Sequence, residues 1–326
     1  MPGEFEIIER YFTPRRSRAD VLLGVGDDAA VLAAPVDRRL VVALDTIVEG
    51  VHFPPQVAAT DVGYRALAVN LSDLAAMGAE PSWMTLSLSL PRADEAWLSG
   101  FAAGLFELAD RHDVALVGGD TVRGPLVVSV QIAGRVEVDR WLTRSGARPG
   151  DLLYVSGSLG EAAAGLSLIE RGTADDGGAA EHLRRRFLRP QPRIELGRAL
   201  RRLASAAMDV SDGLLADTRK LCAASGCGAF IEIDALPRSA ALSELFDEGV
   251  CLQQQLAGGD DYELLFTVEP GREQELKQIV EPQLTRIGVI TSEREVRCLR
   301  NGSDFDPGRV AGYDHFEQRP DGRSAS

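Results

Sequence analysis

The chain has 326 residues, of which 45% are apolar and 26% are charged, as in an ordinary soluble globular protein. A single hydrophobic core stops growing at about 250–300 residues, so this length predicts two domains. The 49 acidic side chains outnumber the 35 Lys and Arg and give a net charge of −14, which argues against a nucleic-acid partner because phosphate binding needs clustered cations.

Membrane and secretory signals are not expected. No run of about 18 apolar residues is present to span a bilayer. The segment MPGEFEIIERYF carries acidic residues and lacks the apolar core of about 7–15 residues that a signal peptide needs. Cys222, Cys227, Cys251 and Cys298 are too sparse for a disulfide framework, so we expect buried or partly buried thiols in a cytoplasmic protein.

The first half of the chain mixes predicted helices and strands. Apolar residues at helical spacing predict three helices, at 4–12, 61–77 and 94–111. Asp61 and Asp94 are expected to cap the second and third helices, and Gly78 to end the second. Apolar runs and alternation predict four strands, at 40–44, 83–90, 114–117 and 126–136.

The second half follows a loop rich in Gly, Pro and Arg, TRSGARPGD at 143–151, which we interpret as the domain boundary. Strands are predicted at 152–156, 229–233, 263–268 and 284–290, with a hairpin turning at Asn301-Gly302. Helices are predicted from about 160, at 193–204 and at 213–225, and EHLRRRF at 181–187 is expected to be a solvated helix face. Mixed helices and strands in both halves predict two α/β or α+β sandwiches.

Aspartates beside glycines or inside apolar segments are the main functional signal. They are Asp27, Asp28, Asp45, Asp73, Asp120, Asp209, Asp212, Asp260 and Asp261. A turn or a helix cap would explain any one of them, but six such segments are harder to dismiss. A hard cation would relieve the repulsion among clustered carboxylates, and oxygen-only ligands favour Mg²⁺, Mn²⁺ or Ca²⁺ over zinc.

The surroundings of these aspartates suggest a metal–phosphate site. Asp45 and Asp120 are predicted to end apolar strands, where α/β proteins often place ligand groups. Asp73 shares a helix face with Asn70, three residues earlier. The chain has no P-loop lysine, so a metal would carry the positive charge. The segment VSGSLGE at 155–161 could be either a phosphate loop at a helix N-terminus or a plain strand–Gly–helix turn.

Eight segments, in chain order, resemble the thiamine-monophosphate kinase family. They are GVGDDAAVL, LDT followed by HF at 52–53, VNLSDLAAMGA, GGDT with RGP, LTRSGARPGD, DVSDGL, GGDDYEL and GYDHF at 312–316. The match runs from about residue 3 to 317. The combination of VNLSDLAAMGA, LTRSGA and GYDHF is specific, whereas a lone GGD or SDG would be weak.

The resemblance implies ATP-dependent phosphorylation of thiamine monophosphate to thiamine diphosphate, with more than one Mg²⁺. It also implies the α+β fold of the aminoimidazole-ribonucleotide-synthetase-like superfamily. There, an N-terminal domain (1–145) binds metal and ATP and dimerises through its sheet, and a C-terminal α+β domain (146–326) completes the active-site cleft. A cytoplasmic homodimer with no nucleic-acid or membrane partner is therefore expected.

The resemblance also assigns roles to individual residues. The implied metal ligands are Asp28, Asp45, Asp73, Asp120, Asp209 and Asp212. The implied ATP contacts are Gly119, Asp120, Arg144 and Ser211, and the implied catalytic residues are Asp120, Arg144 and Asp212. The implied acceptor contacts are His52, Asp260 and Phe316.

The chain departs from the family pattern at two places. Asp260 stands where relatives usually carry Glu, and Ala43-Leu44 stand where they often carry Ser-Thr. Two alternatives stay open: another ATP-using enzyme of the same superfamily, and a non-catalytic Mg-nucleotide-binding module. Turnover of ATP would separate these readings.

Overall fold

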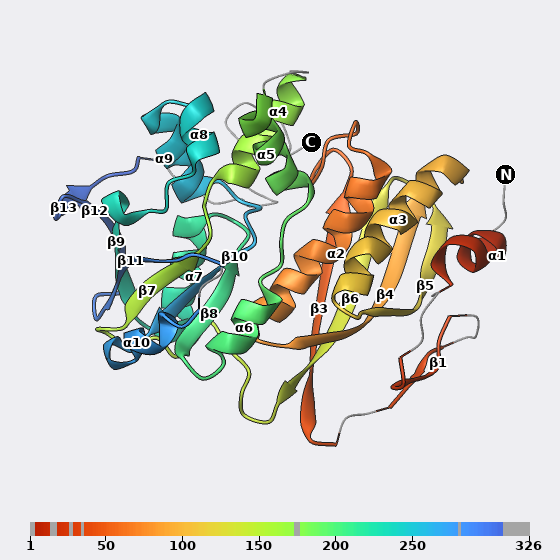
Figure 1. Cartoon of the computed structure of the whole chain (residues 1–326), viewed down its shortest axis with the longest axis horizontal. Helices are drawn as coiled ribbons and strands as arrows, with labels where there is room; N and C mark the ends of the chain where they lie inside the picture. Colours follow the sequence, from red (N-terminus) through yellow and green to blue (C-terminus); the bar gives the residue numbers. More distant parts are fainter. Residues whose placement is uncertain are drawn as a thin grey trace. The chain divides into compact units, whose positions relative to one another are not determined.

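The computed structural model describes residues 4–13, 18–25, 29–33, 36–172, 177–279 and 282–308. The chain forms two compact units (Figure 1). Among the described residues, the N-terminal unit contains those up to Leu74 and Ala79–Asp139, and the C-terminal unit contains Ala75–Gly78 and those from Arg140 onward. Each unit combines helices with a largely antiparallel sheet, which confirms the predicted α+β class. No helix in these ranges is long and apolar enough to cross a membrane.

A four-stranded sheet forms the centre of the N-terminal unit. Its order is β3 (Arg38–Val48), β6 (Val127–Glu137), β4 (Glu80–Leu90) and β5 (Ala115–Arg123). Only β4 and β5 pair in parallel. β3, β4 and β5 are longer than predicted, whereas β6 has the predicted length. β3 is longer because it pairs with β6 over all of its residues. β3 and β5 are therefore the two edges of this sheet.

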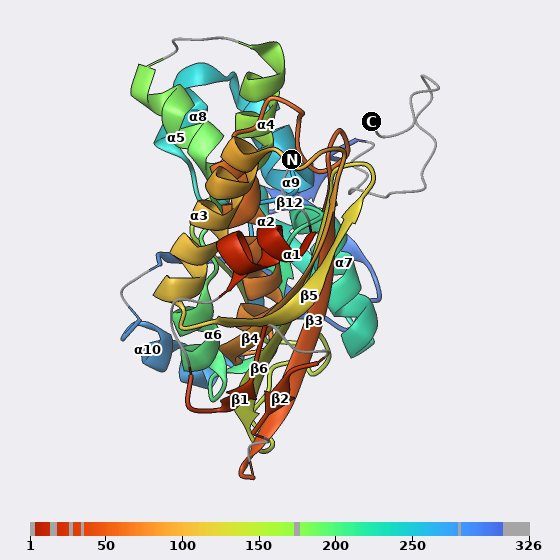
Figure 2. The same cartoon turned by 90° about the vertical axis from the view of Figure 1, so that its right-hand side faces the viewer.

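Helices α2 (Ala59–Ala76) and α3 (Glu95–Arg111) cover one face of this sheet (Figures 1 and 2). Asp94 caps α3 as predicted, because its carboxylate accepts the Trp97 N–H at 3.1 Å. The predicted cap at Asp61 is wrong. The Ala58 carbonyl already accepts the Val62 N–H at 3.0 Å, so Asp61 lies inside the first turn.

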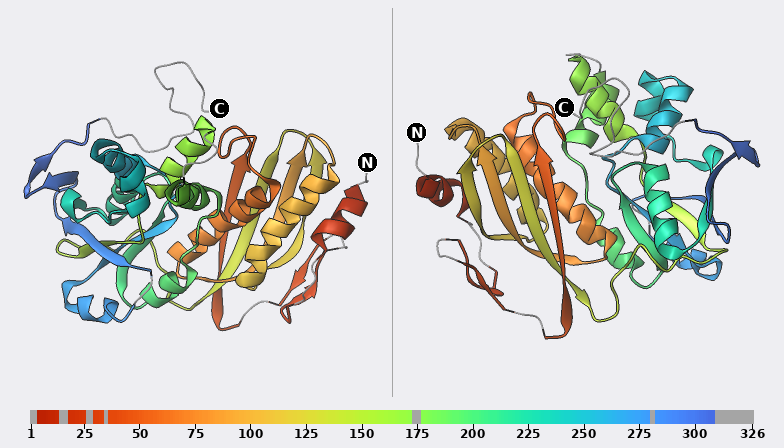
Figure 3. Two further views of the ribbon diagram at one scale, coloured as in Figure 1. Left: turned by 45° about the horizontal axis from the view of Figure 1, so that its top comes forward. Right: turned by 180° about the vertical axis from the view of Figure 1, so that it is seen from behind.

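The other face of the sheet is partly covered by a small hairpin of β1 (Val21–Leu23) and β2 (Val31–Leu32). Val21, Ala30 and Leu32 pack there against a cluster of Trp83, Ala115, Val117 and Ala133. Figure 3 shows this face from behind, with the strands in front of the helices. The strands of the hairpin are too short to show an apolar alternation, so the sequence did not reveal them. The predicted N-terminal helix is present as α1 (Glu4–Ile7), continued by a π-helical turn, η1 (Ile8–Phe12).

A seven-stranded sheet in the order β13-β12-β9-β11-β7-β10-β8 forms the centre of the C-terminal unit. Its strands are β7 (Leu152–Ser156), β8 (Ala204–Val210), β9 (Gly228–Glu232), β10 (Glu263–Val268), β11 (Leu284–Thr291), β12 (Val296–Arg300) and β13 (Ser303–Phe305). Strands β7 and β10 are buried along their whole length and form its core. Strand β8 was not predicted, because ASAAMDV is rich in helix-forming Ala and Met. Burial against β10 overrides that preference.

The helices of this unit are α4 (Glu161–Arg171), α5 (Gly177–Leu188), α6 (Ile194–Leu200), α7 (Leu214–Ser225), α8 (Ala240–Leu245), α9 (Glu248–Ala257) and α10 (Glu273–Leu276), with short turns η2 (Ile233–Ala235) and η3 (Pro270–Arg272). The expected solvated face at 181–187 is wrong in part, because Leu183, Arg186 and Phe187 are buried. A Cβ at Gly165 would lie 2.0 Å from the Leu183 carbonyl oxygen, so α4 and α5 touch through their backbones.

Candidate active site

The predicted site residues are divided between the two units. The N-terminal unit carries Asp45, His52, Asp73, Gly119 and Asp120, and the C-terminal unit carries Arg144, Asp209, Ser211, Asp212 and Asp260. Asp28 and Phe316 lie outside the described residues.

Asp45 lies inside β3 and not at its end as expected, because β3 keeps pairing with β6 as far as Val48. The backbone N–H of Asp45 donates to Oδ1 of Asn70 at 3.0 Å, and Nδ2 of Asn70 donates to the Ala66 carbonyl at 2.9 Å. Asn70 is fully buried. One amide side chain therefore ties α2 to β3 at Asp45, and Asp73 follows Asn70 on α2 by about one turn.

Asp120 also lies inside its strand, β5, and is exposed. Directly across the sheet stand three hydroxyl side chains, one on each other strand: Ser87, Ser129 and Thr46. Thr46 and Ser129 are hydrogen-bonded at 2.7 Å between their hydroxyl oxygens. A Cβ at Gly119 would lie 1.9 Å from the Leu86 carbonyl oxygen, so only glycine fits beside Asp120.

Asp45 and Asp120 are placed at opposite edges of the same sheet. The three strand spacings between β3 and β5 amount to about 14 Å, which is too far for both carboxylates of one chain to bind one cation. Among the described residues, no group of three or more His, Cys, Asp or Glu side chains is arranged to hold a metal ion.

His52 is held in a defined orientation in the loop after β3. The Val48 N–H donates to Nδ1 of His52 at 3.0 Å, and the His52 N–H donates back to the Val48 carbonyl at 2.9 Å. Because Nδ1 accepts a hydrogen bond, the neutral imidazole carries its proton on Nε2. The ring can therefore donate one hydrogen bond through Nε2.

Two loops of the C-terminal unit lie side by side at the end of β8. The Asp260 N–H donates to the Ser211 carbonyl and the Tyr262 N–H donates to the Val210 carbonyl, both at 2.9 Å. Asp260 adopts a positive φ of 69°, and the Tyr262 hydroxyl donates to its carboxylate at 3.0 Å. Asp209, in β8, is buried. The DVSD and GGDDY segments are thus held together as one polar loop pair.

The backbone of the DVSD loop is hydrogen-bonded to Asp217, a fully buried residue of α7. Its Oδ2 accepts the backbone N–H groups of Ser211 at 3.0 Å and Asp212 at 2.9 Å. Its Oδ1 pairs with the Lys220 ammonium at 2.8 Å, and the same ammonium contacts the Asp212 carboxylate. Burial raises the pKa of Asp217 to about 6 although the ammonium opposes the shift.

The GGDDY loop is attached to the start of α4 by one of its own residues, Asp261, which is almost completely buried. Its two carboxylate oxygens accept the N–H groups of Gly160 at 2.6 Å and Ala162 at 3.1 Å, at the start of α4. Burial raises the pKa of Asp261 to about 7. The phosphate-loop interpretation of VSGSLGE is therefore wrong, because a carboxylate of the chain itself occupies this helix N-terminus.

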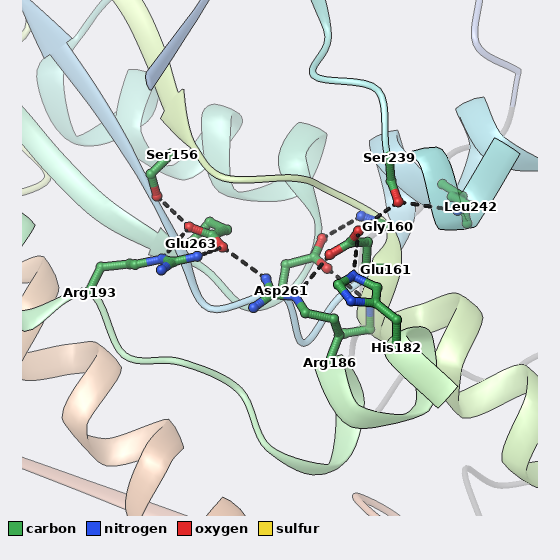
Figure 4. Close-up of polar contacts among 11 residues, drawn as sticks. Ser156, Gly160, Glu161, His182, Arg186, Arg193, Ser239, Leu242, Asp261 and Glu263 are labelled. Atoms are coloured by element: carbon green, nitrogen blue, oxygen red, sulfur yellow. Dashed lines mark hydrogen bonds and ion pairs between the residues drawn. The ribbon is translucent and has the colours of Figure 1, made fainter. Parts of the chain in front are cut away.

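Glu263, next to this loop in β10, is fully buried and accepts from three side chains (Figure 4). Ser156 donates to its carboxylate at 2.6 Å, Arg186 at 2.8 Å, and Arg193 at 2.7 Å through Nε. Arg186 also pairs with Glu161 at 3.0 Å. Strands β7 and β10 and helices α4 and α5 are thus joined through one buried charge network.

Glu161 extends this network toward α8. Its Oε1 accepts from the Ser239 hydroxyl at 2.6 Å and lies 3.0 Å from Nε2 of His182. Ser239 in turn caps α8 by accepting the Leu242 N–H at 3.1 Å. Figure 4 shows that Glu161, Arg186 and Glu263 of this network each bind other side chains of the protein.

Arg144 lies in a loop held against β8 and the end of α7. The Ala207 N–H donates to the Thr143 carbonyl at 2.8 Å, and the Ser225 hydroxyl donates to the Arg144 carbonyl at 3.1 Å. Arg144 itself is exposed. The loop backbone is therefore fixed while the Arg144 side chain faces solvent.

Two family models match the chain. One described as AIR synthase related protein, N-terminal domain, matches residues 26–136, and one described as the C-terminal domain matches residues 148–299. Thiamine-monophosphate kinase of Salmonella typhimurium (strain LT2) is 47% identical over 323 residues, which cover 96% of this chain and 98% of that protein. The chain belongs to the thiamine-monophosphate kinase family.

Solved structures of this kinase family have the same fold. The crystal structure of thiamine-monophosphate kinase from Stenotrophomonas maltophilia K279a has a TM-score of 0.83 and 49% identity, covering 86% of this chain and 92% of that one. A structure described as AaThiL complexed with AMPPCP and TMP has a TM-score of 0.78 and 32% identity, covering 90% and 92%. The two-domain fold implied by the resemblance is therefore confirmed.

The sequence analysis did not predict five residues that fix the loops, strands and helices of the C-terminal unit. They are Asp217, Lys220, Glu263, Arg186 and Arg193. Glu263 stands in the GGDDYEL segment itself, and a charged residue in an otherwise apolar strand is a signal that it is paired. Arg186 stands among Leu183 and Phe187 at helical spacing, which could have placed it on the buried face. Nothing in the sequence singles out Arg193.

The buried network predicts that Glu263→Gln lowers the free energy of unfolding by about 3–5 kcal/mol, because it leaves buried guanidinium groups without their full charge partner. The matched control is Glu195→Gln, which breaks an exposed pair with Arg198 and should change stability by no more than about 0.5 kcal/mol. Urea unfolding followed by circular dichroism measures both. Equal, small effects would contradict the structural role of Glu263.

Proposed function

We propose that the chain transfers the γ-phosphoryl group of ATP to thiamine monophosphate and releases thiamine diphosphate and ADP. The observation that carries this proposal is the near full-length similarity to thiamine-monophosphate kinases, at 47% identity to the Salmonella typhimurium protein. A relative of similar fold has been solved with AMPPCP and TMP. Because the reaction consumes ATP and the cysteines in the described ranges are free thiols, we place it in the cytoplasm.

The negative charge of the acceptor is the main difficulty of this reaction. The second pKa of a monophosphate is near 6, so at pH 7 the acceptor is mostly a dianion and needs no general base. The obstacle is to bring two anions together in line, so positioning and charge neutralisation dominate the catalysis. An acidic chain needs cations to do this.

The carboxylates of the chain are suitable ligands for Mg²⁺, because this ion prefers oxygen atoms. Asp212 already binds a cation, the Lys220 ammonium. The residues that would hold Mg²⁺ are Asp28, Asp45, Asp73, Asp120, Asp209 and Asp212. When bound, more than one Mg²⁺ would neutralise the phosphate oxygens of ATP and of the acceptor. Asp120 and Asp212 would act in catalysis through the cations that they hold.

The remaining predicted residues would position the two substrates. Arg144 has an exposed guanidinium on a fixed loop and would clamp an ATP phosphate through two hydrogen bonds. Gly119 would line the nucleotide with its backbone. Ser211 would contact it through its side chain, because its backbone N–H and carbonyl are bound to Asp217 and Asp260. The acceptor would receive a hydrogen bond from Nε2 of His52 and contacts from Asp260 and Phe316.

The activity is tested by incubating the purified protein with ATP, Mg²⁺ and thiamine monophosphate, and measuring thiamine diphosphate and ADP by chromatography. We expect both products in equal amounts, no ADP increase when unphosphorylated thiamine replaces the monophosphate, and no product in excess EDTA. ADP formation that is indifferent to the acceptor would contradict the proposed reaction.

We also propose that the chain forms a homodimer through the sheet of its N-terminal unit. The β3 side chains Leu40, Val42 and Leu44 are 50%, 59% and 63% exposed and alternate along one face. A contiguous apolar row of this kind is typical of an interaction surface. A second copy of the same sheet has a complementary apolar row, as a twofold interface requires.

A twofold axis parallel to the strands would place the β3 edge of one copy over the β5 edge of the other. Asp120 is aligned with Ser87, Ser129 and Thr46, so its side chain would lie at this interface. Asp45 alternates with Leu44 and Thr46, so its side chain lies on the opposite face of the sheet.

The proposed interface predicts that Val42→Asp, which places a carboxylate in the middle of the apolar row, converts the dimer into a monomer. Analytical ultracentrifugation of both proteins measures the change. A dimer that persists in Val42→Asp would contradict this interface.

A further inference from the structure

Lys220 is one of only two lysines in the chain, the other being Lys277. Its ammonium is shared by two carboxylates, that of Asp217, at 2.8 Å, and that of Asp212. Asp217 and Lys220 are three residues apart on α7, and Asp212 lies in the loop directly before this helix. Their exposures differ: Lys220 is 40%, Asp212 is 31% and Asp217 is 0% exposed.

These exposures decide which of the two ion pairs is permanent. Asp217 is buried and also accepts the N–H groups of Ser211 and Asp212, so removing its cation would leave a buried, unpaired charge. Asp212 is partly exposed, so water or a dissolved cation can replace the Lys220 ammonium as its partner at little cost in free energy. The ammonium is therefore anchored on Asp217, and Asp212 is the partner that can change.

We propose that Lys220 is a positioning residue that competes with Mg²⁺ for the Asp212 carboxylate. Without metal, its ammonium neutralises Asp212 and holds that side chain beside Asp217. With a cation on Asp212, the ammonium stays on Asp217 and repels the cation, so Lys220 raises the Mg²⁺ concentration that the chain requires. This inference rests on the proposed role of Asp212 as a metal ligand.

The Lys220→Met variant separates this role from a merely structural one, because it has two effects of opposite sign. In EDTA, the variant should melt at a lower temperature than wild type, since Asp217 has lost its cation. In a Mg²⁺ titration of the melting temperature without nucleotide, the midpoint should fall by about tenfold, because a positive charge next to the metal is gone. The Mg²⁺ midpoint of turnover should fall in parallel.

Two control variants frame the result. Lys220→Arg keeps a cation at the position, so its melting temperature in EDTA and its Mg²⁺ midpoint should both equal those of wild type. Lys277→Met removes the same net charge from an exposed position at the end of α10 and should change neither. A change in Lys277→Met equal to that in Lys220→Met would reduce the effect to general electrostatics and overturn the proposal.

The proposal and the enzymatic function fail in different ways. An unchanged or raised Mg²⁺ midpoint in Lys220→Met, with normal thiamine diphosphate formation by wild type, overturns the role of Lys220 alone. A lowered midpoint in the melting titration, with no thiamine diphosphate formed by wild type, supports Lys220 and overturns the proposed function.

Discussion

Buried carboxylates that accept backbone N–H groups are the interaction on which the loops of the C-terminal unit depend. Asp261 holds the start of α4, and Asp217 holds the loop before α7. A carboxylate out of water is costly unless each oxygen finds a donor, so each of these side chains fixes the backbone that supplies its donors. The loops are therefore set before any ligand binds, which is the preorganisation that charge-controlled phosphoryl transfer requires.

This constraint divides the aspartates of the chain into two kinds. Asp217 and Asp261 are buried and point into the protein, where they serve as fixed acceptors. Asp212 and Asp260 come from the same loops but are partly exposed. In the N-terminal unit the same task falls to a neutral group, the buried amide of Asn70, which fixes the backbone of Asp45. Buried polar side chains thus fix the backbone beside Asp45 and Asp212.

Much of the fold could be predicted from the sequence, because α2, α3, α7 and the central strands have strong periodicity. The resemblance also pointed to the family. What could not be predicted depends on partners distant in sequence. Strand β8 has a helix-forming composition and becomes recognisable as a strand only through its pairing with β10. Asp261 belongs to the aspartates that form the functional signal, but it binds Gly160 and Ala162, about a hundred residues earlier in the chain. Asp45 and Asp120 read as one cluster until the strand order puts them on opposite edges.

The central claim is that buried carboxylates hold these loops in the absence of ligand. Hydrogen exchange of the backbone N–H groups of Gly160, Ala162, Ser211 and Asp212, measured by NMR without nucleotide or metal, tests it most directly. The account predicts that these amides exchange as slowly as those of the buried strand β10, because each is bound to a buried acceptor. Exchange as fast as that of the exposed turn at 292–294 would contradict it.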